Sequence, residues 1–156
     1  MDFSKQYIKM CKEAKEIQEI YQNILKKEDN EVNNILEGWY VYNGKNVILL
    51  HNNEFFISDL KDELKKYIWL PRQDQLQAII TTNKYFRFSL IELFYHFANK
   101  NVPKFTSMEQ LWLAYVMYIK YKKIWDNEKE KWVKEKDWNL ERNKMIEILT
   151  FLIFMI

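Results

Sequence analysis

The sequence predicts an α+β fold: a mostly helical single domain over residues 1–156 with one β-hairpin packed on helices. Apolar residues recur at spacings of three and four in several stretches, which is the period of amphipathic helices. One run of aromatic and β-branched residues is divided by Asn43-Gly44, a strong hairpin signal. The chain has 156 residues but only two Gly and two Pro, so it is long enough for one core and is not a Gly-rich disordered chain.

The N-terminal stretch is expected to form one amphipathic helix over residues 4–27, with Ser4 as its N-cap. Polar residues without a sustained period follow over residues 26–34 and predict a loop. The helix prediction rests on six apolar residues that recur with Lys and Glu between them: Tyr7, Met10, Ala14, Ile17, Tyr21 and Ile24.

The hairpin is predicted over residues 39–50. A type I′ turn at Asn43-Gly44 requires positive φ at both central residues, which Asn and Gly adopt most readily. Because two strands alone are only marginally stable, we expect a third strand, and residues 54–57 and 85–88 are the two candidates.

The remaining elements are expected to be helices. A short helix capped by Ser58 or Asp59 should place Leu60, Leu64 and Ile68 on one stripe, and Pro71 suits the first turn of the next helix, through Ile80. Alternating Glu and Lys over residues 128–135 predict a solvated segment. Three further helices follow from the capping residues Ser89, Ser107 and Asn139, over residues 89–100, 108–125 and 139–156.

Composition excludes several classes of function. The net charge of +2 gives no strong pull toward nucleic acid or acidic membranes. A single cysteine and the lack of zinc-ligand spacing favour a reducing, cytoplasmic setting without a structural metal. The N-terminus lacks the apolar run of a signal peptide. The apolar tail, residues 146–156, is far shorter than the roughly 20 residues that span a bilayer, so we expect no membrane partner.

Few residues offer catalytic chemistry. Cys11 is the only thiol, and His51 and His96 are the only imidazoles. Cys11 lies on the inward edge of the first predicted helix, which is typical of a small core residue. Gly38 and Gly44 alone cannot build a phosphate-binding loop. We therefore expect no enzymatic activity, no cofactor and no metal site.

Three segments, residues 7–19, 69–77 and 107–114, resemble a family of small uncharacterised proteins of phages and prophages in low-GC bacteria. The strings WLPRQDQLQ and SMEQLWLA carry the resemblance. It implies a phage accessory protein that binds and blocks a host protein or ribonucleoprotein complex in the host cytoplasm, with inhibition of a CRISPR effector as the sharpest version. The pattern departs after Trp125, so residues 126–156 are expected to be a C-terminal extension.

Within the matched segments, the residues predicted to contact a partner are the polar ones after Pro71 and the tryptophan before it: Trp69, Arg72, Gln73, Asp74 and Gln77. The alternative gives each a structural task. Asp74 would favour the positive helix start, Trp69 would pack, and Arg72 would pair with a carboxylate.

Two other surfaces are open alternatives. Lysines and a tryptophan around the end of the 108–125 helix combine positive charge with a ring, as in nucleic-acid-binding grooves. The second alternative surface is the apolar C-terminal helix, through which the chain could form a homodimer. The nucleic-acid alternative uses Lys120, Lys122, Lys123, Lys129 and Trp132.

Overall fold

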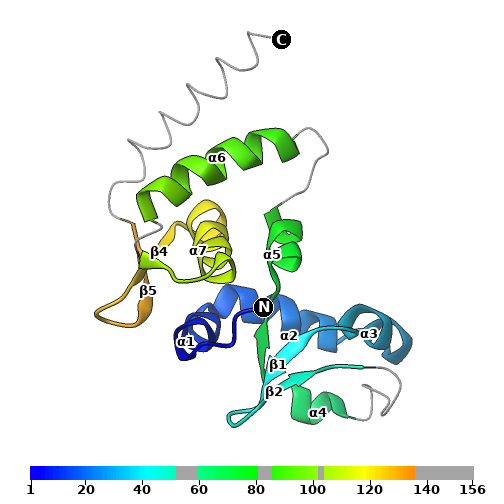
Figure 1. Ribbon diagram of the computed structural model, residues 1–156. Helices are drawn as coiled ribbons and strands as arrows, with labels where there is room; N and C mark the ends of the chain where they lie inside the picture. The colour runs from blue at the N-terminus through cyan, green and yellow to red at the C-terminus, as the bar shows by residue number, and fades with distance from the viewer. Residues whose placement is uncertain (52–59, 81–85, 102–103, 136–156) are drawn as a thin grey trace. The chain divides into compact units, whose positions relative to one another are not determined.

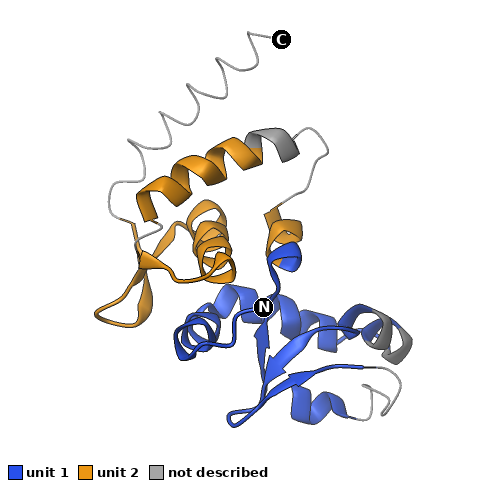
Figure 2. Ribbon diagram, viewed as in Figure 1, with its two compact units in different colours: residues 1–75 blue, residues 76–156 orange. Residues whose placement is uncertain are grey.

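The computed structural model describes residues 1–51, 60–80, 86–101 and 104–135 (Figure 1). The chain divides into two compact units, residues 1–75 and 76–156 (Figure 2). The first holds a three-stranded antiparallel sheet and the second a two-stranded sheet, and each unit also contains helices. The predicted α+β class is confirmed, while the predicted extension over residues 126–156 and the extent of a single domain stay predictions.

In the first unit, two helices replace the single one predicted over residues 4–27. Ser4 is the N-cap as expected, because its hydroxyl accepts the backbone N–H of Tyr7 at 3.1 Å. The helix breaks at Ala14, whose φ of −80° and ψ of 70° are not helical. Ala14 remains buried. The helical spacing of apolar residues therefore continues through the break, and the sequence pattern does not indicate it. The helices are α1 (Lys5–Glu13) and α2 (Lys15–Leu25).

Two other predictions for this unit's helices are wrong. Residues 26–34 are not a loop, because α3 spans Asp29–Leu36 and buries Val32 and Leu36, one helical turn apart. A single pair of apolar residues is too short a pattern to predict a helix from the sequence. The helix expected to carry Ile68 ends earlier, since α4 is Lys61–Leu64. Ser58 and Asp59 lie outside the described residues.

The predicted hairpin is confirmed as β1 (Tyr40–Tyr42) and β2 (Val47–Leu49), and a third strand, β3 (Ile68–Leu70), completes the sheet in the order β2-β1-β3. The candidate strand over residues 85–88 is wrong, because residue 86 already begins a helix. The other candidate, residues 54–57, lies outside the described residues. The type I′ turn is also wrong, because Gly44 has positive φ but Asn43 does not. Instead, Asn43 Oδ1 accepts the N–H groups of Lys45 and Asn46 at 2.9 and 2.8 Å.

The entry into β1 combines a tight turn with a bulge. Glu37 (φ −58°, ψ 131°) and Gly38 (φ +74°) have the angles of a type II turn, closed by the Trp39 N–H on the Leu36 carbonyl at 3.1 Å. Gly38 N–H then donates to the Leu50 carbonyl at 2.8 Å, and Leu50 N–H donates to the Trp39 carbonyl at 2.9 Å. Two residues thus oppose one, as in a bulge with glycine at its first position.

Replacing Gly38 by alanine is expected to lower the free energy of unfolding by about 1–2 kcal/mol, the cost of a left-handed conformation for an L-residue. An added Cβ would lie 3.5 Å from Arg72 Nη1, an ordinary contact, so the loss should come from the backbone. Urea denaturation measures it. Gly38→Asn is the control and should lose less, because Asn tolerates positive φ; equal stability of all three proteins would contradict the turn.

The second unit contains α6 (Phe86–Asn101), α7 (Met108–Tyr121) and a hairpin of β4 (Lys123–Asp126) and β5 (Lys131–Lys134). Ser107 caps α7 as predicted, accepting the Gln110 N–H at 3.1 Å. The helix does not reach Trp125, because Lys122 takes a left-handed conformation (φ 58°) that ends it. The predicted solvated segment over residues 128–135 exposes most of its charged side chains, and it also contains β5. Helix α6 begins before Ser89.

Aromatic side chains pack this unit. Phe94 of α6 stacks on Trp112 of α7 with ring centroids 3.8 Å apart, and Trp125 meets Trp132 across the hairpin at 5.1 Å. The predicted helix over residues 139–156, and with it the proposed homodimer surface, lies outside the described residues. Among the residues that the structure describes, no helix combines the length and apolar content needed to cross a bilayer.

Candidate partner-binding surface at the start of α5

The polar residues of the WLPRQDQLQ string lie where β3 passes into α5 (Gln73–Ile80). The helix begins two residues after Pro71, so Arg72 is its N-cap and Pro71 precedes it, which corrects the prediction that Pro71 lies in the first turn. Gln75, in the third helical position, accepts the Arg72 backbone N–H on Oε1 at 2.8 Å. This is the returning half of a capping box. The Pro71 carbonyl accepts the Tyr7 hydroxyl of α1, which anchors the junction.

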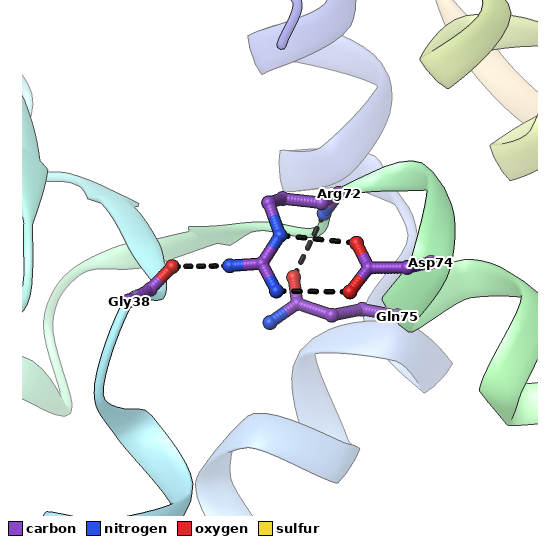
Figure 3. A network of polar contacts seen from close by, with 4 residues as sticks. All are labelled: Gly38, Arg72, Asp74 and Gln75. Atoms are coloured by element: carbon purple, nitrogen blue, oxygen red, sulfur yellow. Dashed lines mark hydrogen bonds and ion pairs between the residues drawn. The ribbon is translucent and has the colours of Figure 1, made fainter.

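The Arg72 guanidinium connects two parts of this junction (Figure 3). Its Nε and Nη2 donate to the two carboxylate oxygens of Asp74 at 3.0 and 2.9 Å. Its Nη1 donates to the carbonyl of Gly38 in the turn before β1. A planar guanidinium suits this use because its donors point in fixed directions. Arg72 thus fixes the orientation of Asp74 and ties the start of α5 to the entry of β1.

The ion pair at this surface is fully charged at neutral pH. The hydrogen bond from Arg72 and its positive charge, with backbone N–H groups at the helix start, hold the pKa of Asp74 below its usual range. Asp74 in turn raises the pKa of Arg72. The side chains are 36% and 66% exposed, so solvent screens the pair and its contribution to stability is small. Its main effect is to hold a carboxylate in one place at the surface.

Trp69 does not belong to that surface. It is 1% exposed and stacks on Trp39 with centroids 4.4 Å apart and an interplanar angle of 16°. Tyr21 of α2 stacks against the same ring at 6.5 Å. Trp69 therefore packs under the junction and cannot itself touch a partner that docks there, in agreement with the structural alternative.

The structure places the remaining predicted contact residues on or near the junction. Arg72, Gln73 and Asp74 are together at the start of α5, with Gln73 half-buried. Gln77 is also half-buried and lies one turn further along the same helix. Gly38 and Gln75 complete the network in Figure 3, although neither was predicted to belong to it. The three-residue spacing from Arg72 to Gln75 is a capping-box signal, but the N-cap residue lacks the usual hydroxyl.

Gln18 of α2 was also missed, although it secures the outer edge of β3. Its Oε1 accepts the Trp69 N–H at 2.9 Å, and its Nε2 donates to the Trp69 carbonyl at 3.0 Å. Since Trp69 pairs with Val41 in a position where these groups face away from β1, the Gln18 amide takes the place of a neighbouring strand. No sequence pattern indicates such a contact between residues 51 positions apart.

The residues of the nucleic-acid alternative have other contacts. Lys120 Nζ donates to the Ile79 carbonyl at 3.3 Å and Lys122 Nζ to the Ile119 carbonyl at 2.5 Å. Lys129 pairs with Asp126 at 3.0 Å. Lys123 opens β4, and Trp132 is 9% exposed, against Trp125. These contacts suit the ends of helices and a hairpin turn, and the Trp132 ring offers little face for base stacking. Nucleic-acid binding stays a prediction.

Cys11 is a core residue, as predicted. It is fully buried, and burial raises its pKa, so the thiol stays protonated at neutral pH and is a poor nucleophile. His51 and His96 are exposed. Within the described ranges, no group of three His, Cys, Asp or Glu side chains has a metal-binding arrangement.

No protein-family model, no curated protein and no solved structure matches this chain. The resemblance of residues 7–19, 69–77 and 107–114 to small phage proteins therefore stays an expectation that rests on these sequence segments alone. The structure adds where these strings lie. The first covers α1 and the start of α2, the second covers the β3–α5 junction, and the third covers the capped start of α7.

Proposed function

We propose that this protein is a non-enzymatic phage accessory protein that binds a host protein or ribonucleoprotein complex and inhibits it. An inhibitor of a CRISPR effector, or of another defence system, is the sharpest version. The proposal is supported by the resemblance of the WLPRQDQLQ and SMEQLWLA strings. The observation that carries it furthest is the Arg72–Asp74 pair, which is rigidly held while 66% of the Asp74 side chain faces solvent.

A fixed carboxylate is well suited to docking. Each Asp74 oxygen accepts one bond from Arg72, and backbone N–H groups at the helix start also stabilise the carboxylate. The exposed side of the carboxylate can still accept a hydrogen bond from a partner's donor. The side chain is already confined to one orientation, so less conformational entropy is lost when a partner binds. A hydrogen bond to a charged acceptor is also stronger than one between neutral groups.

The chemistry of this surface indicates the chemistry of the partner. Asp74 accepts hydrogen bonds, and the neighbouring Gln73 amide both donates and accepts. The complementary surface would supply Lys, Arg or amide N–H donors opposite Asp74. Because Arg72 balances the charge of Asp74, the pair does not attract cations over a long range, and specificity would come from close fit.

The test is to titrate the full chain into purified candidate CRISPR effector complexes and to follow both complex formation and target cleavage. We expect a stable complex and loss of cleavage with at least one effector. Asp74→Asn and Gln73→Arg should each raise the Kd about tenfold or more if these residues lie in the contact.

The matched control is Asp62→Asn. Asp62 is also an exposed aspartate with a pKa lowered by a cationic neighbour, Lys65, but it lies on α4. Its substitution should leave the Kd within about twofold. Absence of a complex with every effector would contradict the inhibitor proposal, and a complex that Asp74→Asn and Gln73→Arg leave unchanged would contradict the surface.

The nucleic-acid alternative predicts a different result. Binding of RNA or DNA through lysines releases counterions, so it should weaken steeply between about 50 and 200 mM salt. Binding that is absent, or that does not depend on salt, would remove this alternative.

A further inference from the structure

Arg72 and Asp74 hold different positions in the surface at the start of α5. The Arg72 side chain is 36% exposed and the Asp74 side chain is 66% exposed. The bond from Arg72 Nη1 to the Gly38 carbonyl is partly buried, whereas both bonds to Asp74 are exposed. The guanidinium therefore lies between the carboxylate and the turn before β1 (Figure 3), and the carboxylate is the more accessible group.

The guanidinium holds two groups at once. Its Nε and Nη2 donate to separate oxygens of Asp74 at 3.0 and 2.9 Å, and its Nη1 donates to the Gly38 carbonyl. Gly38 is itself held, because its N–H donates to the Leu50 carbonyl at 2.8 Å. The donors of a planar guanidinium point in fixed directions. A guanidinium bound to Gly38 therefore sets the direction of the Asp74 carboxylate.

Arg72 is the main group that holds this carboxylate. Its hydrogen bond is the largest cause of the lowered pKa of Asp74, and backbone N–H groups at the helix start contribute less. Among the residues that the structure describes, no other side chain donates a hydrogen bond to Asp74. Without the guanidinium, the Asp74 side chain would regain rotamer freedom. Ordering it again would then cost conformational entropy when a partner binds.

We propose that Arg72 is a positioning residue of this surface, which acts on the partner through Asp74 by holding the carboxylate in the orientation that the partner's donors meet. This inference rests on the proposed function. The partner it implies carries N–H donors aimed at one fixed carboxylate, so binding depends on the direction of that group as well as on its charge. Lysine cannot replace Arg72 in this role, because an ammonium group has no planar pair of donors.

A double-mutant cycle separates positioning from direct contact. The four proteins are the wild type, Arg72→Lys, Asp74→Ala and the double variant, and the measurement is the Kd for the effector complex that the chain inhibits. Arg72→Lys keeps the positive charge and removes the paired donors, so it should raise the Kd about fivefold or more when Asp74 is present. In the Asp74→Ala background, the same substitution should change the Kd by less than about twofold.

Two controls distinguish a lost position from a lost fold. Urea denaturation shows whether each variant is folded, and a purely structural role for Arg72 would lower the denaturation midpoint but leave the Kd of the folded protein unchanged. Lys65→Gln is the matched substitution, because it breaks the exposed ion pair of Lys65 with Asp62 on α4. It should leave the Kd within about twofold. If Asp74→Ala does not fold, Asp74→Asn takes its place in the cycle.

The possible failures can be told apart. If Arg72→Lys raised the Kd equally in both backgrounds, Arg72 would contact the partner directly, and the positioning role would be overturned. An unchanged Kd in both backgrounds would overturn it as well, because Asp74 would then bind without being held. In either case a complex that Asp74→Ala weakens leaves the proposed function in place. Absence of a complex with every effector contradicts the proposed function, and the positioning role with it.

Discussion

Replacing Trp69 by alanine is expected to lower the free energy of unfolding by about 3–5 kcal/mol. The ring is 1% exposed and packs against Trp39 and Tyr21, which also contact each other. Its removal leaves a cavity in the centre of the first unit and ends two aromatic contacts, each of which adds to the loss from buried area. Urea denaturation followed by circular dichroism measures the change.

The same variant separates a structural role from a contact role. Trp69→Phe is the matched control and should lose less, because it keeps a ring in the stack. If Trp69→Ala weakened partner binding while its unfolding free energy stayed within about 1 kcal/mol of the wild type, the ring would have to act at the surface, contrary to its position.

Replacing Gln18 by glutamate is expected to lower the free energy of unfolding by about 3 kcal/mol at pH 7. The change removes the donor to the Trp69 carbonyl, 3.0 Å away, and sets a carboxylate against that carbonyl oxygen. The Trp69 N–H still donates to one oxygen of the new carboxylate. The other oxygen faces the carbonyls of Trp69 and Cys11 without a donor, which costs more than a neutral amide in the same position. The loss should appear as a lower denaturation midpoint at unchanged m-value.

The effect should depend on pH. Repulsion from the carbonyl raises the folded-state pKa of the new glutamate above the value of about 4.3 in the unfolded chain. The variant should therefore be closest to wild type below that unfolded-state value and should lose stability as pH rises through the raised folded-state pKa. Gln22→Glu is the control, since Gln22 donates to the Lys65 carbonyl in an exposed position, and a deficit equal to that of Gln18→Glu would contradict the proposed edge contact.

The sequence predicted well where local chemistry decides the structure. The hydroxyls of Ser4 and Ser107 cap the helices that follow them, and the run around Asn43-Gly44 forms a hairpin. Such signals depend on a few neighbouring residues. Breaks within a regular pattern were missed for the same reason: the apolar period passes through Ala14, and Lys122 adopts a left-handed conformation that lysine rarely favours.

The β3 strand and the candidate site depend on contacts distant in sequence. The β3 strand has only three residues, 68–70, which is too few for a clear strand pattern in the sequence. It forms because these residues pair with β1. The sequence predicted that Arg72 could pair with a carboxylate and that Asp74 could favour the helix start. It predicted neither that Asp74 is that carboxylate nor that the Gly38 carbonyl, 34 positions away, fixes the guanidinium. Likewise, the sequence does not indicate whether the Trp69 ring is buried or exposed. Its burial becomes clear only from the stack with Trp39 in the folded chain.

The most direct test of the proposed function is amide hydrogen exchange of the full chain, free and in the presence of the effector complex whose cleavage it blocks. The first N–H groups of α5 have no acceptor within the helix and exchange readily unless another group covers them. The account predicts that the complex slows exchange at Gln73 and Asp74 while residues of α4 remain unchanged. Unchanged exchange at the start of α5 in a complex that blocks cleavage would contradict it.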